Sequence, residues 1–283
     1  MKASIEVTQL EKIRDDFHLG PININIEPGI VTALVGNNGA GKSTLIKTIM
    51  NLVKPSSGDI RILGSYVEET QDWQKEIAYL PQNKLGYDPF NGNQLKELIA
   101  SLYPNWDDKL FNRMVKELDV NLRKNFKSLS PGMQQKLLLS LTIPRNTPIL
   151  ILDEPTSHID IVSKSILLDL LAEWMEHDDR TLILATHQVE DIRKLADMVA
   201  IMKDGDLLAH TDKDSLTQSY TQYWMVDPLP SDSLPGEVKR KGSKSIVTEN
   251  EVQLEQYLSQ HQLNWLNKEQ LSLEDTISLM LTI

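Results

Sequence analysis

The sequence contains no cysteine among its 283 residues, which excludes disulfide bonds and thiolate chemistry. It also lacks any apolar run near the ~18 residues that a transmembrane helix needs. Charged side chains interrupt residues 1–17, where a signal peptide would be apolar. We therefore expect a cytoplasmic chain that could act at a membrane only as a peripheral subunit.

Basic residues are fewer than acidic residues. The chain has 29 Lys and Arg against 40 Asp and Glu, a net charge of -11. Phosphate backbones attract clustered Lys and Arg, so this balance argues against nucleic acid as a partner. Hydrophobic residues make up 40% and charged residues 24%, which is ordinary for a globular protein. The length allows one domain and an appendage.

Short apolar segments alternate with segments of helical period, which predicts an α/β fold with a parallel sheet. Residues 30–35, 149–152 and 181–185 are expected to be strands buried on both faces. Between the first two strands, residues 93–102 and 107–118 have helical periodicity. Asp107 is the candidate N-cap of the second helix.

The clear alternation ends near Asp206. Residues 227–245 are rich in Pro, Ser, Gly and Lys, which predicts turns or a linker. Residues 251–262 and 273–282 are expected to form two short helices. We expect the region from 209 to 283 to be a separate accessory part.

A glycine-rich loop follows the first strand. Residues 36–43 read GNNGAGKS and precede a helical segment, the strand–loop–helix context of a phosphate-binding loop. Glycine lets successive backbone N–H groups turn toward a phosphate. Lys42 would reach the β- and γ-phosphates, and the Ser43 hydroxyl would ligate Mg²⁺. The residues expected to bind the nucleotide are Gly36, Asn37, Asn38, Gly39, Ala40, Gly41, Lys42, Ser43 and Thr44.

Two carboxylates end the strand at 149–152. Ligands of parallel sheets bind at the carboxyl ends of strands, so Asp153 and Glu154 should face the nucleotide. Asp153 suits Mg²⁺, through water. Glu154 could polarise the attacking water, a contribution of about 10²–10⁴-fold. On its own, an acidic pair after a strand is as often a solvated strand end as a catalytic pair. Together with the glycine-rich loop at 36–43, the catalytic interpretation is favoured.

The order of these motifs resembles the ABC ATPases. The loop at 36–43 is followed by Gln82 in YLPQN, LSPGM at 129–133, LILDEPTS at 150–157, Asp160, and His187 in ATHQVED. The resemblance covers residues 3 to about 208. It implies a P-loop NTPase fold: a mostly parallel sheet core, antiparallel N-terminal strands, a helical insertion at about 83–135, and a small C-terminal α+β appendage. It also implies an ATPase domain at 1–208, with ATP and Mg²⁺ as ligands.

In such ATPases two copies pair head to tail, and each ATP lies between the loop of one copy and the signature segment of the other. By resemblance the signature segment is Leu129, Ser130, Pro131, Gly132 and Met133, and Asp160 would also contact the second copy. The common form is LSGGQ, so residues 131 and 133 depart from it. Ser130 as N-cap and Pro131 as the first helical residue would tolerate the change.

The resemblance implies three catalytic side chains. Glu154 would act on the attacking water, His187 would hold the γ-phosphate and Glu154 in register, and Gln82 would sense both the water and the metal. The implied Mg²⁺ ligands are Ser43, Gln82 and Asp153. Arg14 and Phe17 are both candidates to stack on adenine. His158 stands where small residues are usual.

Two stretches narrow the resemblance to one branch. SLYPNWDDKLFNRMVKELDV with LSPGMQQK, and the C-terminal SLEDTISLML, look like bacterial ATPase subunits of type-two exporters of peptides, antibiotics or similar amphiphiles. This implies an integral membrane permease on another chain, a homodimer or a paralogous ATPase partner, and a location on the inner face of the membrane. The candidate permease contacts are Tyr87, Phe90, Leu98 and Tyr103; for each of them, a place in the core of the insertion is an equally good interpretation.

Two alternatives remain open. One is a soluble ABC ATPase of translation or repair; the single loop and the acidic balance oppose it. The other is a regulatory ATP-binding module without turnover, which the presence of Glu154 and His187 opposes. The basic residues Lys239, Arg240, Lys241 and Lys244 are either a headgroup-binding run or, more simply, a solvated hairpin tip.

Overall fold

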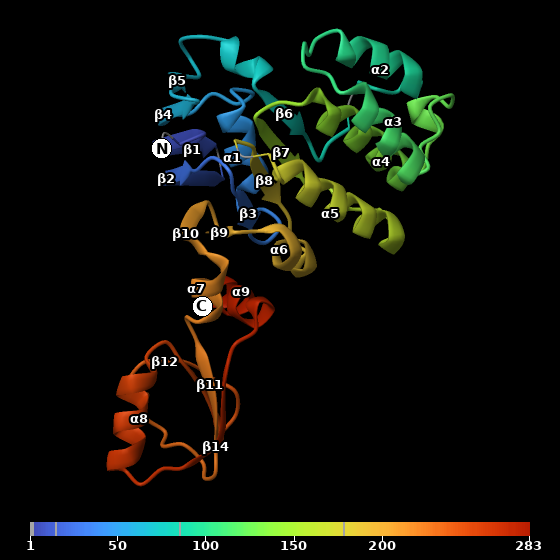
Figure 1. Ribbon diagram of the computed structural model, residues 1–283. Coiled ribbons are helices and arrows are strands. Elements are labelled where there is room, and N and C mark those ends of the chain that lie inside the picture. Colours follow the sequence, from blue (N-terminus) through green and yellow to red (C-terminus); the bar gives the residue numbers. More distant parts are fainter. Residues whose placement is uncertain (1–2, 15, 85, 178) are drawn as a thin grey trace. The chain divides into compact units, whose positions relative to one another are not determined.

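The computed structural model describes all residues except 1, 2, 15, 85 and 178, and it divides into two compact units. The first unit extends to His210 and the second covers Thr211–Ile283. Figure 1 shows the elements of both.

A six-stranded sheet forms the centre of the first unit. Its spatial order is β10 (Asp206–Asp212), β9 (Met198–Lys203), β3 (Val31–Val35), β8 (Thr181–Ala185), β7 (Ile149–Asp153) and β6 (Ile77–Leu80). Strand β3 pairs in parallel with β8 and β9, and β7 pairs in parallel with β6 and β8. The three strands predicted from the sequence are confirmed.

Both faces of this sheet are covered, which explains its continuous apolar strands. Leu150 and Leu152 pack in one cluster with residues of α4 (Pro131–Thr142) and α5 (Ile161–Met175). Ile149 and Ile151 point to the opposite face and pack with residues of α1 (Lys42–Ile49). Because alternate side chains of a strand face opposite sides, an unbroken apolar run indicates a strand with no solvated face.

A second, antiparallel sheet contributes to the α1 side of the core. It is built from β2 (Phe17–Ile26), β1 (Ile5–Arg14), β4 (Ser57–Ile62) and β5 (Ser65–Tyr66), in that order. Strands β1 and β2 form a hairpin whose last register pair is Arg14 with Phe17. The antiparallel N-terminal strands and the mainly parallel core therefore agree with the predicted fold class.

The helical part between β6 and β7 contains α2 (Gly92–Ala100), α3 (Asp108–Glu117) and α4, with short 3₁₀ turns at Phe126–Ser128 and Ile143–Arg145. Asp107 caps α3 as predicted, since its Oδ1 accepts from the N–H groups of Lys109 and Leu110, both at 2.9 Å. The apolar stripe of α3 packs into the same cluster as Leu150. A further 3₁₀ turn, Asp72–Lys75, precedes β6, and α6 (Val189–Leu195) follows β8.

The second unit is an antiparallel sheet with helices. Its order is β12 (Glu237–Arg240), β13 (Ser245–Thr248), β11 (Thr221–Met225) and β14 (Trp265–Gln270), with α7 (Lys213–Thr217), α8 (Glu251–Gln260) and α9 (Leu273–Thr282). Tyr223 and Ile246 pack with Leu254 and Leu258 of α8. The two predicted helices are present, at 251–260 and 273–282.

The expectation of turns or a linker at 227–245 is wrong in part, because residues 237–240 form β12. Arg240 holds this polar segment in place: its guanidinium donates to the Glu237 carboxylate at 2.6 Å and to the backbone carbonyls of Pro230 and Asp232. Lys241 and Lys244 also bond within the unit, to Gln222 and the Val226 carbonyl. These contacts favour the hairpin interpretation of the basic residues over a headgroup-binding run.

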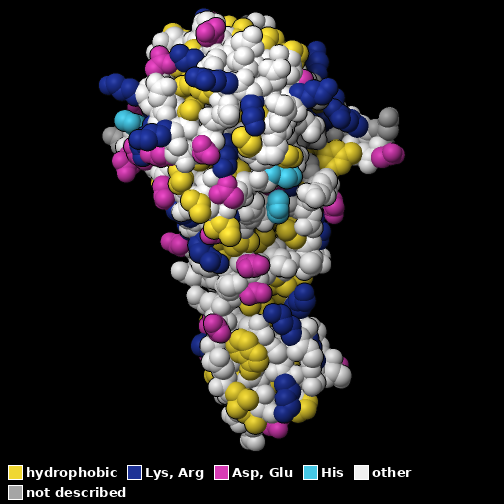
Figure 2. Space-filling model, turned by 90° about the vertical axis from the view of Figure 1, so that its right-hand side faces the viewer, with side chains coloured by type: hydrophobic (Ala, Val, Ile, Leu, Met, Phe, Trp, Pro, Cys, Tyr) yellow, Lys and Arg dark blue, Asp and Glu magenta, His cyan; other side chains and the backbone are white. Residues whose placement is uncertain are grey.

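Among the described residues no helix is both long and apolar enough to cross a bilayer. Figure 2 shows charged side chains of both signs on one face of the molecule, with hydrophobic side chains between them.

Candidate functional site

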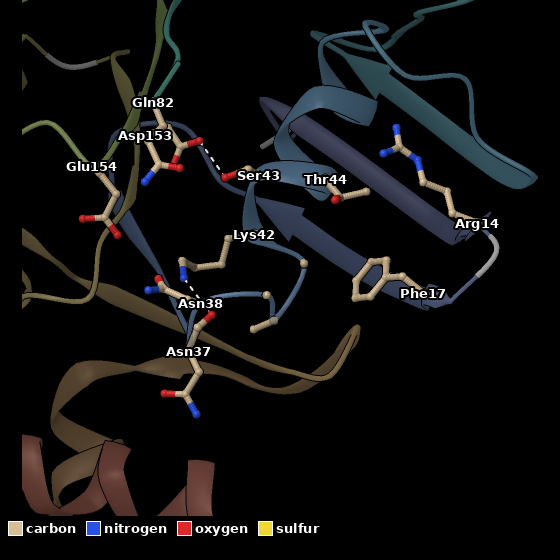
Figure 3. Close-up of a pocket in the computed structure, with 13 residues that line it drawn as sticks. Arg14, Phe17, Asn37, Asn38, Lys42, Ser43, Thr44, Gln82, Asp153 and Glu154 are labelled. Atoms are coloured by element: carbon tan, nitrogen blue, oxygen red, sulfur yellow. Dashed lines mark hydrogen bonds between the residues drawn. The ribbon is translucent and has the colours of Figure 1, made fainter. Parts of the chain in front are cut away.

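A pocket of about 470 Å³ in the first unit collects most of the predicted nucleotide site. Figure 3 shows that its walls come from the β1–β2 hairpin, the loop before α1, the first turn of α1, the segment after β6 and the end of β7. Its lining residues are Arg14, Phe17, Asn37, Asn38, Gly39, Ala40, Gly41, Lys42, Ser43, Thr44, Gln82, Asp153 and Glu154.

Gly41 makes the turn from the loop into α1. Its φ of 105° lies in the left-handed region, where other residues are strained. A Cβ there would lie 2.9 Å from Leu19 Cδ1 and 3.1 Å from Phe17 Cζ. The helix therefore starts at Lys42, with its first turn open to the pocket. Unpaired N–H groups and the positive end of the helix dipole favour a phosphate at this point.

Lys42 is buried and folds back onto the loop. Its Nζ donates to the carbonyl oxygens of Gly36 at 2.6 Å and Asn37 at 3.2 Å. Burial lowers the pKa of Lys42, while the nearby Glu154 and Asp153 carboxylates oppose the shift. The ammonium group thus lies within the pocket, next to the loop that would carry the phosphates. Gly36 does not line the pocket, but its carbonyl is one of the two oxygens that hold Lys42.

Ser43, in the first turn of α1, contacts Asp153 at the end of β7. The Ser43 hydroxyl donates to Asp153 Oδ2 at 2.9 Å, and Asp153 is only 2% exposed. Burial raises the pKa of Asp153, and the bond from Ser43 opposes this rise. A hydroxyl and a carboxylate at this distance are oxygen donors of the kind that Mg²⁺ prefers. Gln82 lies in the same pocket, so the donor set fits the predicted metal.

Glu154 and His187 also meet. Oε1 of Glu154 lies 2.9 Å from Nδ1 of His187, while the Ser157 hydroxyl is 3.4 Å from Oε2. Glu154 is 5% exposed and has a φ of 54°, an unusual conformation for this residue type. Its backbone N–H donates to the Ala185 carbonyl at 2.9 Å, which fixes the strained residue at the edge of the sheet. The two side chains come from the ends of neighbouring strands, β7 and β8.

The signature segment does not line this pocket; it lies at the start of α4, where Pro131 borders a neighbouring cavity with Gln82 and Glu154. Ser130 is the N-cap and its Oγ accepts from the Met133 N–H at 3.4 Å, with Pro131 as the first helical residue, as predicted. Leu129 is buried in the core, whereas Ser130 and Pro131 are exposed. Gly132 has a role that the sequence did not suggest: a Cβ there would lie 2.4 Å from the carbonyl oxygen of His158. The backbone of His158 therefore packs directly against the start of α4.

Asp160 caps α5. It accepts from the Ser163 N–H at 2.9 Å and forms an ion pair with Lys136 of α4 at 2.8 Å. The bond with Lys136 and those from Ser163 lower the pKa of Asp160. Its side chain is still 57% exposed, so it remains accessible to a second chain.

Arg14 and Phe17 lie at the pocket side opposite to Asp153 and Glu154 (Figure 3). They face each other across the β1–β2 hairpin, which places both candidates for the adenine contact at one rim.

Comparison with known proteins identifies the family. A family model described as ABC transporter matches residues 19–157. The molybdate/tungstate import ATP-binding protein WtpC of Methanocaldococcus jannaschii is 33% identical over 219 residues, which cover 75% of this chain and 72% of that protein. The chain belongs to the ABC transporter ATP-binding proteins. Proteins of this family bind and hydrolyse ATP, so this chain is an ABC ATPase.

Further relatives of this ABC ATPase agree with the assignment. The ABC transporter ATP-binding protein YtrB of Bacillus subtilis is 28% identical over 223 residues, covering 78% of this chain and 76% of that protein. A solved structure of an ATP-binding subunit of an ABC transporter superposes with a TM-score of 0.68 at 25% identity, covering 75% of this chain and 91% of that chain. The family works with membrane permease subunits and as dimers.

Two polar side chains of this ABC ATPase support the site but were missed from the sequence. Gln135 is buried in α4 and its Nε2 donates to the Glu154 carbonyl at 3.3 Å and the Pro155 carbonyl at 3.0 Å. Lys84 donates to the Pro131 carbonyl at 3.1 Å, which links the segment after Gln82 to the signature segment. Gln135 lies in the quoted stretch LSPGMQQK, but the sequence does not show that its side chain bonds to the backbone carbonyls after β7, and Lys84 stands in no motif.

Proposed function

We propose that this ABC ATPase uses Glu154 to polarise the water that attacks ATP. The observation that carries the proposal is the 2.9 Å contact between Glu154 and His187 at the edge of the pocket that contains Lys42 and Asp153. A carboxylate in contact with an imidazole is held in one orientation, and orientation is what a catalytic base requires.

ATP would lie on residues 36–44, with Lys42 released from the loop carbonyls to the phosphates. Ser43 and Asp153 would hold Mg²⁺ together with Gln82, and the ion would supply positive charge at the phosphate oxygens. His187 would contact the γ-phosphate, and Arg14 or Phe17 would stack on adenine. The exposed Ser130 and the accessible carboxylate of Asp160 support a shared site in which residues 129–133 of one chain complete the pocket of another.

Mutation of the base tests the reaction. Glu154→Gln keeps the shape but not the charge, so we expect ATP binding to persist while turnover falls by at least about 10²-fold. A closed dimer should then accumulate in ATP on size-exclusion chromatography. Glu176→Gln, an exposed change at the end of α5, is the matched control. Rapid hydrolysis by Glu154→Gln would rule out this residue as the base.

We further propose that residues 1–208 are the ATPase domain, with a helical insertion at about 83–135, and that residues 209–283 are an accessory region. The ATPase would sit on the inner face of the membrane and drive an exporter of peptides, antibiotics or similar amphiphiles. The sequence resemblance to exporter subunits supports export. WtpC is an import protein by name, so import is the competing direction.

The insertion offers a surface for the permease. Phe90 and Leu98 are exposed, Leu98 at 53%, whereas Tyr87 packs on Phe126 and Tyr103 accepts a hydrogen bond from Arg145 at 3.2 Å. Phe90 and Leu98 therefore offer the most exposed surface of the four expected contacts, while Tyr87 and Tyr103 are half-buried.

Co-purification from native membranes tests the permease contact. Leu98→Glu should reduce capture of the integral membrane protein at least about tenfold, since burying an unpaired charge is costly. Val252→Glu, on α8 and 67% exposed, is the control that should not. The captured protein, identified by mass spectrometry, also distinguishes an exporter from an importer. Equal capture by both variants would contradict the assigned surface.

A further inference from the structure

A buried carboxylate lies behind the site, and none of the roles proposed above uses it. Asp191, in the first turn of α6, has no exposed surface. Its Oδ2 accepts from the hydroxyl of Thr156 at 2.6 Å and from that of Thr186 at 3.4 Å. Its Oδ1 forms an ion pair with Lys164 Nζ at 2.9 Å. None of these four residues lines the nucleotide pocket.

Lys164 comes from α5 and is largely buried. In addition to its ion pair with Asp191, its ammonium donates to Gln188 Oε1 at 2.6 Å and to Glu190 Oε2 at 2.8 Å. Burial alone would lower the pKa of Lys164, but the bonds to Glu190 and Asp191 outweigh it and the pKa is raised. The cation is therefore retained, and the buried carboxylate is compensated.

These contacts converge from both sides of the Glu154–His187 pair. Thr156 lies two residues after Glu154, on the segment that leads to Asp160. Thr186 and Gln188 flank His187, and the Gln188 N–H also donates to the Thr186 hydroxyl at 3.0 Å. A single carboxylate thus joins the segment after β7, the segment after β8 and α5.

We propose that Asp191, with Thr156 and Lys164, is a positioning residue that holds His187 against Glu154. The inference rests on the proposed roles of Glu154 and His187. An ionised carboxylate without exposed surface is costly unless every partner stays in place, so the two segments cannot separate without breaking bonds to it. Hydrogen bonds to a charged acceptor are also the strong ones, and the Thr156 bond is short.

Thr156→Val is the decisive variant because it keeps the shape and removes only the hydroxyl. We expect kcat to fall roughly 10- to 100-fold, since a displacement near 1 Å can cost about 10²-fold. KM for ATP should stay within about twofold, because Thr156 does not line the pocket. Thr156→Ser should restore kcat. Asp191→Asn should lower kcat in the same way.

The chain offers a matched control. Lys194 of α6 pairs with Asp169 of α5 at 2.8 Å, an exposed contact between the same two helices. Lys194→Met should leave kcat unchanged. The ¹⁵N signals of the His187 ring, assigned by their loss in His187→Gln, should move in Thr156→Val and Asp191→Asn but not in Lys194→Met.

Two results would overturn the positioning role: wild-type kcat and an unmoved His187 signal in Thr156→Val, or an equal loss of kcat in Lys194→Met. Failure of the proposed function is a separate outcome. If Glu154→Gln is inactive and Thr156→Val fully active, only the positioning role falls. If Glu154→Gln still turns over, the base assignment falls with it.

Discussion

Gly132→Ala should destabilise the first unit although alanine favours helices. The added Cβ would lie 2.4 Å from the His158 carbonyl oxygen, about 1 Å inside ordinary contact. Replacing glycine by alanine inside a helix usually gains about 1 kcal/mol. Overpacking of this kind typically costs about 1–3 kcal/mol. The net effect is therefore a loss of about 0–2 kcal/mol, where an unobstructed site would show a gain.

Thermal unfolding distinguishes the expected loss of stability from a gain. In a unit of this size 1 kcal/mol corresponds to roughly 2–4 °C in Tm, so we expect a decrease of up to about 8 °C where an open site would give an increase. Ser165→Ala, an exposed substitution in α5, is the control and should raise Tm slightly. ATPase activity should fall at least about tenfold, because the start of α4 must move and Ser130 moves with it.

A Gly132→Ala variant that is more stable than wild type and retains full ATPase activity would refute the predicted clash. That result would mean that the close approach of His158 to α4 does not exist in the folded protein. Higher stability with lost activity would instead assign Gly132 to phosphate contact alone.

Two further predictions concern the pocket itself. Asp153→Asn should stabilise the nucleotide-free protein by about 1–3 kcal/mol at neutral pH, because the amide can still accept from Ser43 without a buried charge. The pKa of Asp153 is raised in the folded state, so wild-type stability falls as pH rises above the ordinary Asp range; urea unfolding should show the gap closing as the pH is lowered to about 4. Lys42→Ala should weaken ATP binding about 10²-fold, from the loss of a charged donor, and calorimetry showing unchanged affinity would contradict the loop assignment.

The sequence was most informative where the chain is buried on both sides. In an α/β protein, an unbroken apolar run such as ILIL at 149–152 is typical of a strand buried on both faces, so the central strands were predictable. The pocket was predictable for a different reason: Gly41 is required by the turn into α1, and Lys42 and Ser43 follow it at the spacing that phosphate and Mg²⁺ binding requires.

The second unit was less predictable. Strand β14 is exposed along its length and carries no alternation of apolar and polar residues, and β12 is a four-residue strand, EVKR, in which Arg240 bonds to Glu237. Strand β12 pairs with the neighbouring β13, but β14 depends on β11, which is distant in the chain. The contact of Gly132 with His158 and the contacts of Asp191 also join residues that are distant in the chain. They exist only in the folded protein, so no local sequence pattern predicts them.

The position of Lys42 has a consequence for the loop around it. The loop carries a cation of its own against two of its carbonyl oxygens, and this contact ties residues 36 and 37 to the start of α1. In the mode of ATP binding proposed above, the ammonium group would exchange these carbonyl oxygens for oxygens of the triphosphate. One cation would then serve the loop before binding and the phosphates after it.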